Sequence, residues 1–201
     1  MSWPLTRASG ECNAGGTAHR DFLVGLNSID KSASRTDPSG VISRPAGTYY
    51  FNKDGLMQTG LVRFEDGNLR YFDPETGAMV TNQWHKDYEA VWYYFDADGT
   101  AVSGWQSIGG DKYYFYPESH DMAYGRVQID GKNYFLNTPG ANADGRMQHS
   151  GWFYDSIYGK WSYATSDGEL LTGWHNLGGA WYYFNESGGM LTGWVNDSGT
   201  W

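Results

Sequence analysis

The sequence is short of the residues that usually stabilise or anchor a small domain. It has one cysteine, Cys12, so it can form neither an internal disulfide framework nor a cysteine-rich metal site. Leu, Ile and Val are sparse, which excludes a conventional aliphatic core. No stretch is long and apolar enough to span a bilayer, so we expect no membrane insertion. The amino terminus lacks a basic start followed by an apolar run, and we expect no signal peptide in this chain.

Catalytic and nucleotide-binding motifs are also missing. The sequence has no HExxH, G-x-S-x-G, P-loop or dinucleotide fingerprint. The segment Asp96–Gly99 (DADG) starts like a calcium loop but lacks the later ligands, so we interpret it as a hairpin turn. The net charge is −9. Residues 1–47 hold five basic and four acidic residues, so the negative charge comes from the rest of the chain. An acidic surface repels phosphate backbones. We therefore expect no enzyme activity, cofactor, metal site or nucleic-acid partner.

Aromatic residues and glycine take the place of the missing aliphatics, with 10 Trp, 16 Tyr and 28 Gly in 201 residues. The run from residue 179 to 194, GAWYYFNESGGMLTGW, is one unit of an internal repeat. An anchor placed at Trp181 has equivalents along the chain at intervals of 20 to 28 residues. These anchors are Thr48, Leu69, Trp92, Lys112, Asn133, Trp161, Trp181 and Trp201.

Each unit has the same four parts. The anchor starts an aromatic strand such as WYYF, and a polar, Gly-rich turn such as DADG or ESGG follows. A small or apolar residue comes next, at Met57, Met79, Ala101, Met122, Met147, Leu170 and Met190. The unit then ends in Gly-Trp or a relative of it, and we call the residue in the Trp position the closing residue. The closing residues are Leu61, Trp84, Trp105, Arg126, Trp152, Trp174 and Trp194.

These parts are typical of a β-hairpin. Alternating aromatics suit a pleated strand, and Asp-Gly or Asn/Ser/Gly clusters supply the positive φ that tight loops require. A single hairpin is marginal in water, whereas stacked neighbours can bury each other's aromatic faces. The sequence therefore predicts an all-β chain of tandem β-hairpin repeats, stacked as a β-solenoid, with a largely irregular N-terminal segment. We expect most Met positions and strand aromatics to serve packing.

Two regions are predicted. Residues 48–201 hold about seven units plus a truncated one, with an enlarged loop around residues 138–145 where the interval is 28 residues. Residues 1–47 do not join the pattern, and we interpret them as a linker or the remnant of an upstream domain. Because the last unit stops at Trp201 in mid-strand, we expect the sequence to be a fragment.

The pattern GW…WYYF…G.M.TGW, clearest in residues 174–194, resembles the choline-binding and glucan-binding repeat family of Gram-positive surface proteins, to which clostridial toxin repeats are related. The resemblance covers residues 48–201. It implies a cell-surface or secreted location and a module that anchors a larger protein, with any catalysis in a separate domain. It also implies a choline-containing teichoic acid or a surface polysaccharide as partner.

In the choline-binding form of this family, each ligand lies between consecutive hairpins. It is held by the closing Trp, the first aromatic of the following strand and a Tyr from the next unit. The resemblance therefore implies candidate cages, and Lys112, Leu61 and Arg126 should leave other interfaces incomplete. The cages are Trp84 and Trp92 with Tyr114, Trp152 and Trp161 with Tyr183, Trp174 with Trp181, and Trp194 with Trp201.

Three functions stay open at this point. A module for choline-bearing wall polymer is favoured by the paired tryptophans. A carbohydrate-binding module for a glucan or another glycan is favoured by Lys112, Arg126 and the toxin-like unit at residues 104–115. A structural stalk, in which the repeats only pack, would need no exposed tryptophan pairs.

Overall fold

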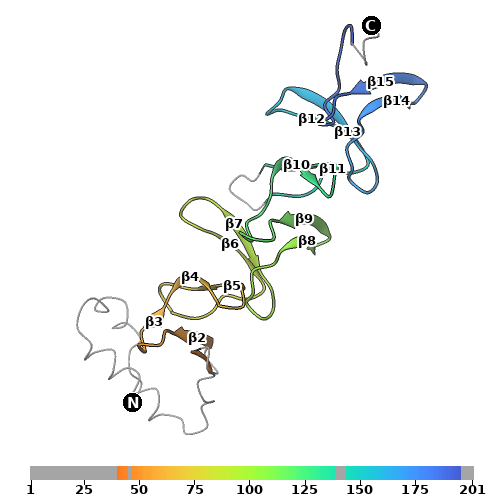
Figure 1. Cartoon of the computed structure of the whole chain (residues 1–201). Helices are drawn as coiled ribbons and strands as arrows, with labels where there is room; N and C mark the ends of the chain where they lie inside the picture. The colour runs from red at the N-terminus through yellow and green to blue at the C-terminus, as the bar shows by residue number, and fades with distance from the viewer. Residues whose placement is uncertain (1–39, 45–46, 139–143, 196–201) are drawn as a thin grey trace. The chain divides into compact units, whose positions relative to one another are not determined.

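A computed structural model describes residues 40–44, 47–138 and 144–195 of the chain. Every regular element among them is a β-strand, and the strands form one three-stranded sheet and six two-stranded sheets (Figure 1). The all-β, tandem-hairpin prediction is confirmed. No helix in the described residues is long and apolar enough to cross a membrane.

The hairpins follow one another in chain order. The three-stranded sheet has the order β1-β2-β3, and each later sheet pairs two consecutive strands. The strands are β1 (Val41–Arg44), β2 (Gly47–Phe51), β3 (Met57–Gln58), β4 (Gly60–Arg63), β5 (Leu69–Phe72), β6 (Gln83–Lys86), β7 (Trp92–Phe95), β8 (Gly104–Ile108), β9 (Asp111–Phe115), β10 (Gly125–Ile129), β11 (Lys132–Leu136), β12 (Gly151–Asp155), β13 (Lys160–Ala164), β14 (Gly173–Leu177) and β15 (Ala180–Phe184).

Polar side chains close the turns after the aromatic strands. Asp96 Oδ1 accepts the backbone N–H of Asp98 at 3.0 Å and of Thr100 at 2.9 Å, so DADG is a hairpin turn. At Asp73, hydrogen bonds from the backbone N–H and then the hydroxyl of Thr76 hold the pKa of the carboxyl below its usual value. The acidic residues of these turns therefore hold the turn backbone in place through hydrogen bonds.

One face of each hairpin packs. In β14–β15 the register places Trp174 opposite Tyr183 on one face and His175 opposite Tyr182 on the other. The last residue of each second strand lies on the packed face and is completely buried. These residues are Phe72, Phe95, Phe115, Leu136, Ala164 and Phe184.

A repeated backbone hydrogen bond links successive hairpins. The N–H of Met190, after the turn that follows β15, donates to the carbonyl of Trp161, the anchor of the preceding hairpin, at 2.7 Å. Five further pairs repeat this bond at 2.7–2.8 Å, so the anchors are the points at which consecutive units join. They are Met79 to Thr48, Ala101 to Leu69, Met122 to Trp92, Met147 to Lys112 and Leu170 to Asn133.

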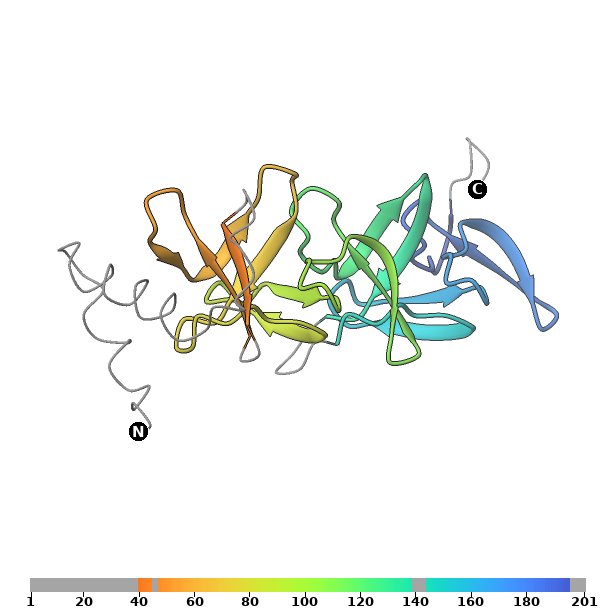
Figure 2. The same ribbon diagram turned by 90° about the horizontal axis from the view of Figure 1, so that it is seen from below.

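The chain divides into two compact units. The first contains residues up to 85 together with 94–101, and the second contains residues 86–93 and 102–201. Within the second unit, consecutive hairpins from β10 to β15 point in different directions (Figure 2). Its core includes a cluster of Ala123, Leu136 and Met147, so the prediction that the Met positions serve packing is confirmed there.

The repeat structure starts earlier than the aromatic pattern indicates. Strand β1 lies within the segment that we expected to be irregular, and its residues Val41–Arg44 pair with β2. The sequence VISR contains no aromatic residue, which is why the pattern missed it. Much of the enlarged loop, residues 1–39 and Trp201 lie outside the described residues.

Candidate ligand-binding seams

We call the region where one hairpin meets the next a seam. Each seam has four parts. Two come from one hairpin, namely the closing residue in its first strand and the anchor in its second strand. The other two come from the next unit, namely the residue after the anchor and the residue at the Met position. The repeated bond to the anchor carbonyl holds the Met position beside the anchor. Three complete seams lie in the second unit, and each has different side chains at these places.

The closing tryptophan of each hairpin packs edge-on against a tyrosine of its own second strand. Trp105 and Tyr114 have ring centroids 5.2 Å apart, and Trp174 and Tyr183 are 5.1 Å apart. In both hairpins the two residues are directly opposite in the register. A T-shaped contact of this kind uses the edge of one ring, so it leaves part of the indole face available.

The same tryptophans also reach the next hairpin. Trp105 lies 4.9 Å from the ring of Tyr134, and Trp152 lies 4.9 Å from the ring of Tyr182. Tyr134 and Tyr182 each follow directly after an anchor, so they belong to the packed face of their hairpin. A closing tryptophan therefore stands between the open face of its own hairpin and the packed face of the next.

The seam after β12–β13 carries two tryptophans of the second predicted cage, Trp152 and Trp161, whose grouping around a ligand stays a prediction. Trp152 is 40% exposed and Trp161 is 47% exposed, on the same face of the hairpin. The next-unit tyrosine beside Trp152 is Tyr182, whereas the predicted Tyr183 packs on Trp174. Matching to the family did not single out Tyr182. The alternation of side chains along a strand could have done so, because it places Tyr182 on the packed face, which meets the preceding hairpin.

The third and fourth predicted cages are described in part. Trp174 is 50% exposed and Trp181 is 66% exposed, on one face of β14–β15. Trp194 is 86% exposed, and its predicted partner Trp201 lies outside the described residues. The indoles of Trp174 and Trp181 are thus open to solvent on the face where a ligand was predicted.

The first predicted cage draws on both compact units. Trp84 belongs to the first unit, and Trp92 and Tyr114 belong to the second, so the grouping of all three stays a prediction. One contact adds to it: the ammonium of Lys86 lies 5.5 Å from the centroid of the Trp92 ring. This cation already occupies one indole face, which sequence reasoning did not anticipate.

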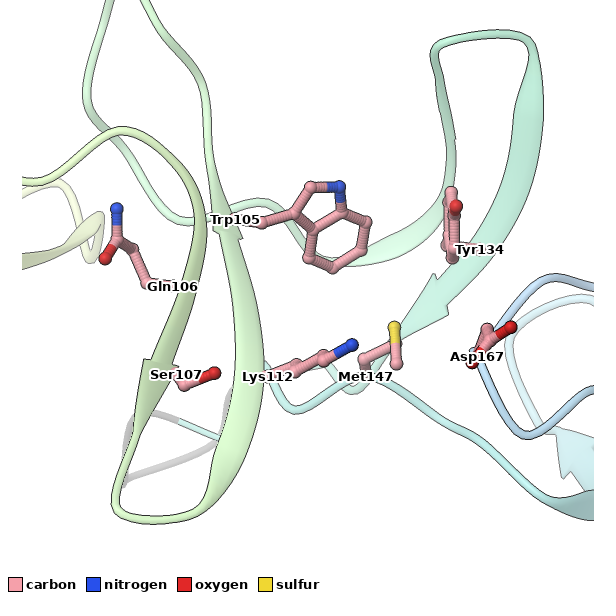
Figure 3. Close-up of a pocket in the computed structure, with 7 residues that line it drawn as sticks. All are labelled: Trp105, Gln106, Ser107, Lys112, Tyr134, Met147 and Asp167. Carbon is pink, nitrogen blue, oxygen red and sulfur yellow. The ribbon is translucent and has the colours of Figure 1, made fainter.

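The seam between β8–β9 and β10–β11 forms a pocket of about 370 Å³ (Figure 3). The anchor there is Lys112 rather than an aromatic residue. The pocket is lined by Trp105, Gln106, Ser107, Lys112, Tyr134, Met147 and Asp167. It therefore keeps two of the rings of an aromatic cage and adds two charged groups.

The seam after β10–β11 is closed by a buried ion pair. Arg126 Nε donates to Asp155 at 2.8 Å, and their side chains are 10% and 0% exposed. The same guanidinium donates to Ser162 Oγ at 2.7 Å and to the carbonyl of Ser187 at 2.6 Å. Ser162 is the residue after the anchor in the next hairpin, where the other two seams have tyrosine. This seam is a polar lock with no open ring pair.

Paired strands with open indoles at repeated seams define a tandem β-hairpin repeat module. A family model described as "Choline-binding repeat" matches residues 46–84 and 171–201, and one described as "Putative cell wall binding repeat" matches residues 82–101 and 103–117. The chain belongs to the choline-binding and glucan-binding family of cell-wall-binding repeats.

Relatives by sequence are much longer proteins. The chain is 35% identical over 126 residues to glucosyltransferase-S of Streptococcus mutans, covering 63% of this chain and 8% of that protein. It is 29% identical to glucosyltransferase-I of Streptococcus downei, covering 64% of this chain and 11% of that protein. The chain thus spans about a tenth of the length of these enzymes.

Solved structures share the fold. Choline binding protein F of Streptococcus pneumoniae, determined in the presence of a peptidoglycan analogue, is 29% identical with a TM-score of 0.61, and the match covers 76% of this chain and 52% of that one. CbpJ of the same species is 28% identical with a TM-score of 0.62 and the same coverage of the two chains.

Proposed function

We propose that this chain is a non-catalytic module that binds a choline-bearing polymer at a bacterial cell surface and anchors a larger protein there. The observation that carries the proposal is the seam of Trp152, Trp161 and Tyr182, where two indoles are 40% and 47% exposed beside a third ring. A structural stalk has no use for such exposed pairs, and the family to which the chain belongs includes choline-binding repeats.

A quaternary ammonium is the cation that suits such a seam. It cannot donate hydrogen bonds, and it gains roughly 0.5–2 kcal/mol from each aromatic face that it covers. Three partly desolvated faces give about 3–5 kcal/mol in gross attraction, using the same range. A free energy near 4 kcal/mol corresponds to a dissociation constant of about 1 mM. Weak sites of this kind retain a polymer only when several engage at once, and linkage adds roughly 10²–10⁴ to the overall affinity.

Titration of intrinsic tryptophan fluorescence with choline tests the proposal. We expect a saturable change at millimolar choline, because the rings that bind the ligand are the fluorophores. Trp152→Ala should weaken binding at its seam and reduce the amplitude. Tyr88→Ala is the matched control, since Tyr88 is almost fully exposed in a hairpin loop and should leave the titration unchanged. No change in the wild-type spectrum up to saturating choline would reject the proposal.

A glucan is the second candidate ligand. One face of β12–β13 carries Trp152, Tyr154, Trp161 and Tyr163 in opposed pairs, and neutral sugar rings stack on aromatic faces of this kind. The sequence relatives are glucosyltransferases, which also favours this candidate. Retention on dextran together with no response to choline would favour the glucan over the choline-bearing polymer.

A further inference from the structure

The pocket beside Trp105 differs from an aromatic cage in its charges. Lys112 replaces the anchor ring, and its Nζ points into the space between Trp105 and Met147 (Figure 3). Asp167 lies on the opposite side, near Tyr134, and comes from the turn after β13. Within the described part of the chain, neither Lys112 nor Asp167 forms a salt bridge. The pocket therefore presents one ammonium and one carboxylate across a space lined by two rings.

Each group favours one sign of charge on a ligand and opposes the other. The faces of Trp105 and Tyr134 and the carboxylate of Asp167 attract a cation. Lys112 repels a simple quaternary ammonium that enters the same space, and Asp167 repels a simple anion. A ligand that carries both charges avoids these penalties and pairs each charged side chain with its opposite, whereas a neutral sugar avoids the penalties but leaves both charges unpaired.

We propose that this pocket binds a zwitterion, an ammonium joined by a short linker to a phosphate or carboxylate. The cationic end lies against Trp105, Tyr134 and Asp167, and the anionic end meets the ammonium of Lys112. The inference builds on the proposed function, because a choline group attached to a polymer through phosphate is a zwitterion. It adds that one seam recognises the anionic half, which an all-aromatic seam does not bind.

Other charges near the pocket are already partnered. Lys132 donates to Glu169 at 2.7 Å, and that hydrogen bond and charge, with a smaller contribution from Asp167, raise the pKa of Lys132. Arg146 pairs with Asp144 and Asp111. Lys112 is thus the lining cation available to an anionic group, and Lys132 provides a matched surface lysine for comparison.

The test uses NMR of the tryptophan indole N–H groups in the full chain, with the Trp105 signal assigned through Trp105→Phe. The probes are phosphocholine, betaine, choline, inorganic phosphate and isomaltose. We expect phosphocholine to shift the Trp105 signal with an affinity about fivefold higher than choline, the range of a partly exposed ion pair. Betaine carries a carboxylate where phosphocholine carries a phosphate, so a comparison of the two shows which anionic group the pocket prefers. Lys112→Gln should abolish the preference for phosphocholine at Trp105, and Lys132→Gln should not.

The outcomes separate this inference from the proposed function. Equal affinities for choline and phosphocholine at Trp105, or a response to isomaltose alone, would overturn the zwitterion site. If the Trp152 signal responds to choline in the same titration, the proposed function stands without it. If no indole signal responds to choline or phosphocholine, both fail. Asp167→Asn should weaken binding of choline and phosphocholine alike, because it removes attraction for the shared ammonium.

Discussion

At the scale of single residues, the side chain at a seam position decides whether the seam is open or closed. Trp152 with Tyr182 leaves exposed rings, whereas Arg126 with Ser162 fills the equivalent space with hydrogen bonds. Replacement of a ring pair by a guanidinium network converts a surface for ligands into a contact between repeats. Because the strands around these residues have the same register, the difference lies in the side chains rather than in the fold.

Removal of the Arg126 side chain should destabilise the second unit strongly. Arg126→Ala leaves the carboxylate of Asp155 fully buried without its counter-charge, which costs about 3–5 kcal/mol in comparable buried pairs. Chemical denaturation followed by circular dichroism measures the free energy of unfolding. Lys132→Ala, which breaks the exposed pair with Glu169, is the control and should change stability little. A similar small effect of both variants would contradict the assignment of Arg126 as a lock.

Sequence reasoning interpreted Arg126 as a replaced closing tryptophan and as a residue favouring a glycan ligand, and it did not foresee the buried ion pair. Its partners Asp155, Ser162 and Ser187 lie 29, 36 and 61 residues further along the chain. No local pattern links these positions, since the contact depends on how successive hairpins stack. The same reason explains why Asp167 could not be assigned to the pocket of Trp105 from the sequence.

At the scale of the hairpin, a turn glycine joins several units to their predecessors in addition to the anchor bond. A Cβ added at Gly168 would clash with the Sδ and Cε atoms of Met147, and Gly188 makes the equivalent contact with Leu170. Met147 is buried in the core of the second unit. The turn glycine therefore gives the Met position of the preceding unit its space, as well as permitting a φ of +89° at Gly168.

Gly168→Ala should be more destabilising than Gly173→Ala. Both glycines have positive φ, which costs an L-residue roughly 1–2 kcal/mol. Gly173 has open space where a Cβ would lie, so Gly173→Ala measures the backbone cost alone. Gly168→Ala should add about 1–3 kcal/mol, because Met147 must be displaced from a packed core. Equal free energies of unfolding for the two variants would show that the turn glycine does not pack on Met147.

The hairpins themselves could be predicted because aromatic alternation, Asp-Gly turns and the closing glycine all indicate the same local structure. The anchor positions found in the sequence are the residues whose carbonyls accept the bonds between units. Strand β1 was missed because VISR lacks an aromatic residue. The contact of Tyr182 with Trp152 was not foreseen, because family matching took no account of which strand face meets the preceding hairpin, and the role of Tyr183 at a ligand stays a prediction. Both concern contacts between elements, which a repeat pattern does not encode.

At the scale of the whole chain, retention of a polymer depends on several weak sites acting together. Open indoles recur at Trp152, Trp161, Trp174 and Trp181, and the acidic repeats add a long-range attraction for cationic groups that salt screens. Binding of a polymer that presents many choline groups should therefore be far stronger than binding of free choline. Because linked sites multiply in their effect on affinity, loss of one seam should lower retention by more than the fraction of sites that is removed.

Retention on a choline-analogue resin, compared with a dextran resin, shows whether the chain recognises choline through its tryptophan seams. The wild-type chain should bind the choline-analogue resin and elute with free choline. The double variant Trp152→Ala and Trp161→Ala should elute at a lower choline concentration, while its circular dichroism spectrum keeps the β signal. Passage of the wild-type chain through the choline-analogue resin without retention, or equal retention of the folded double variant, would contradict recognition through open tryptophan seams.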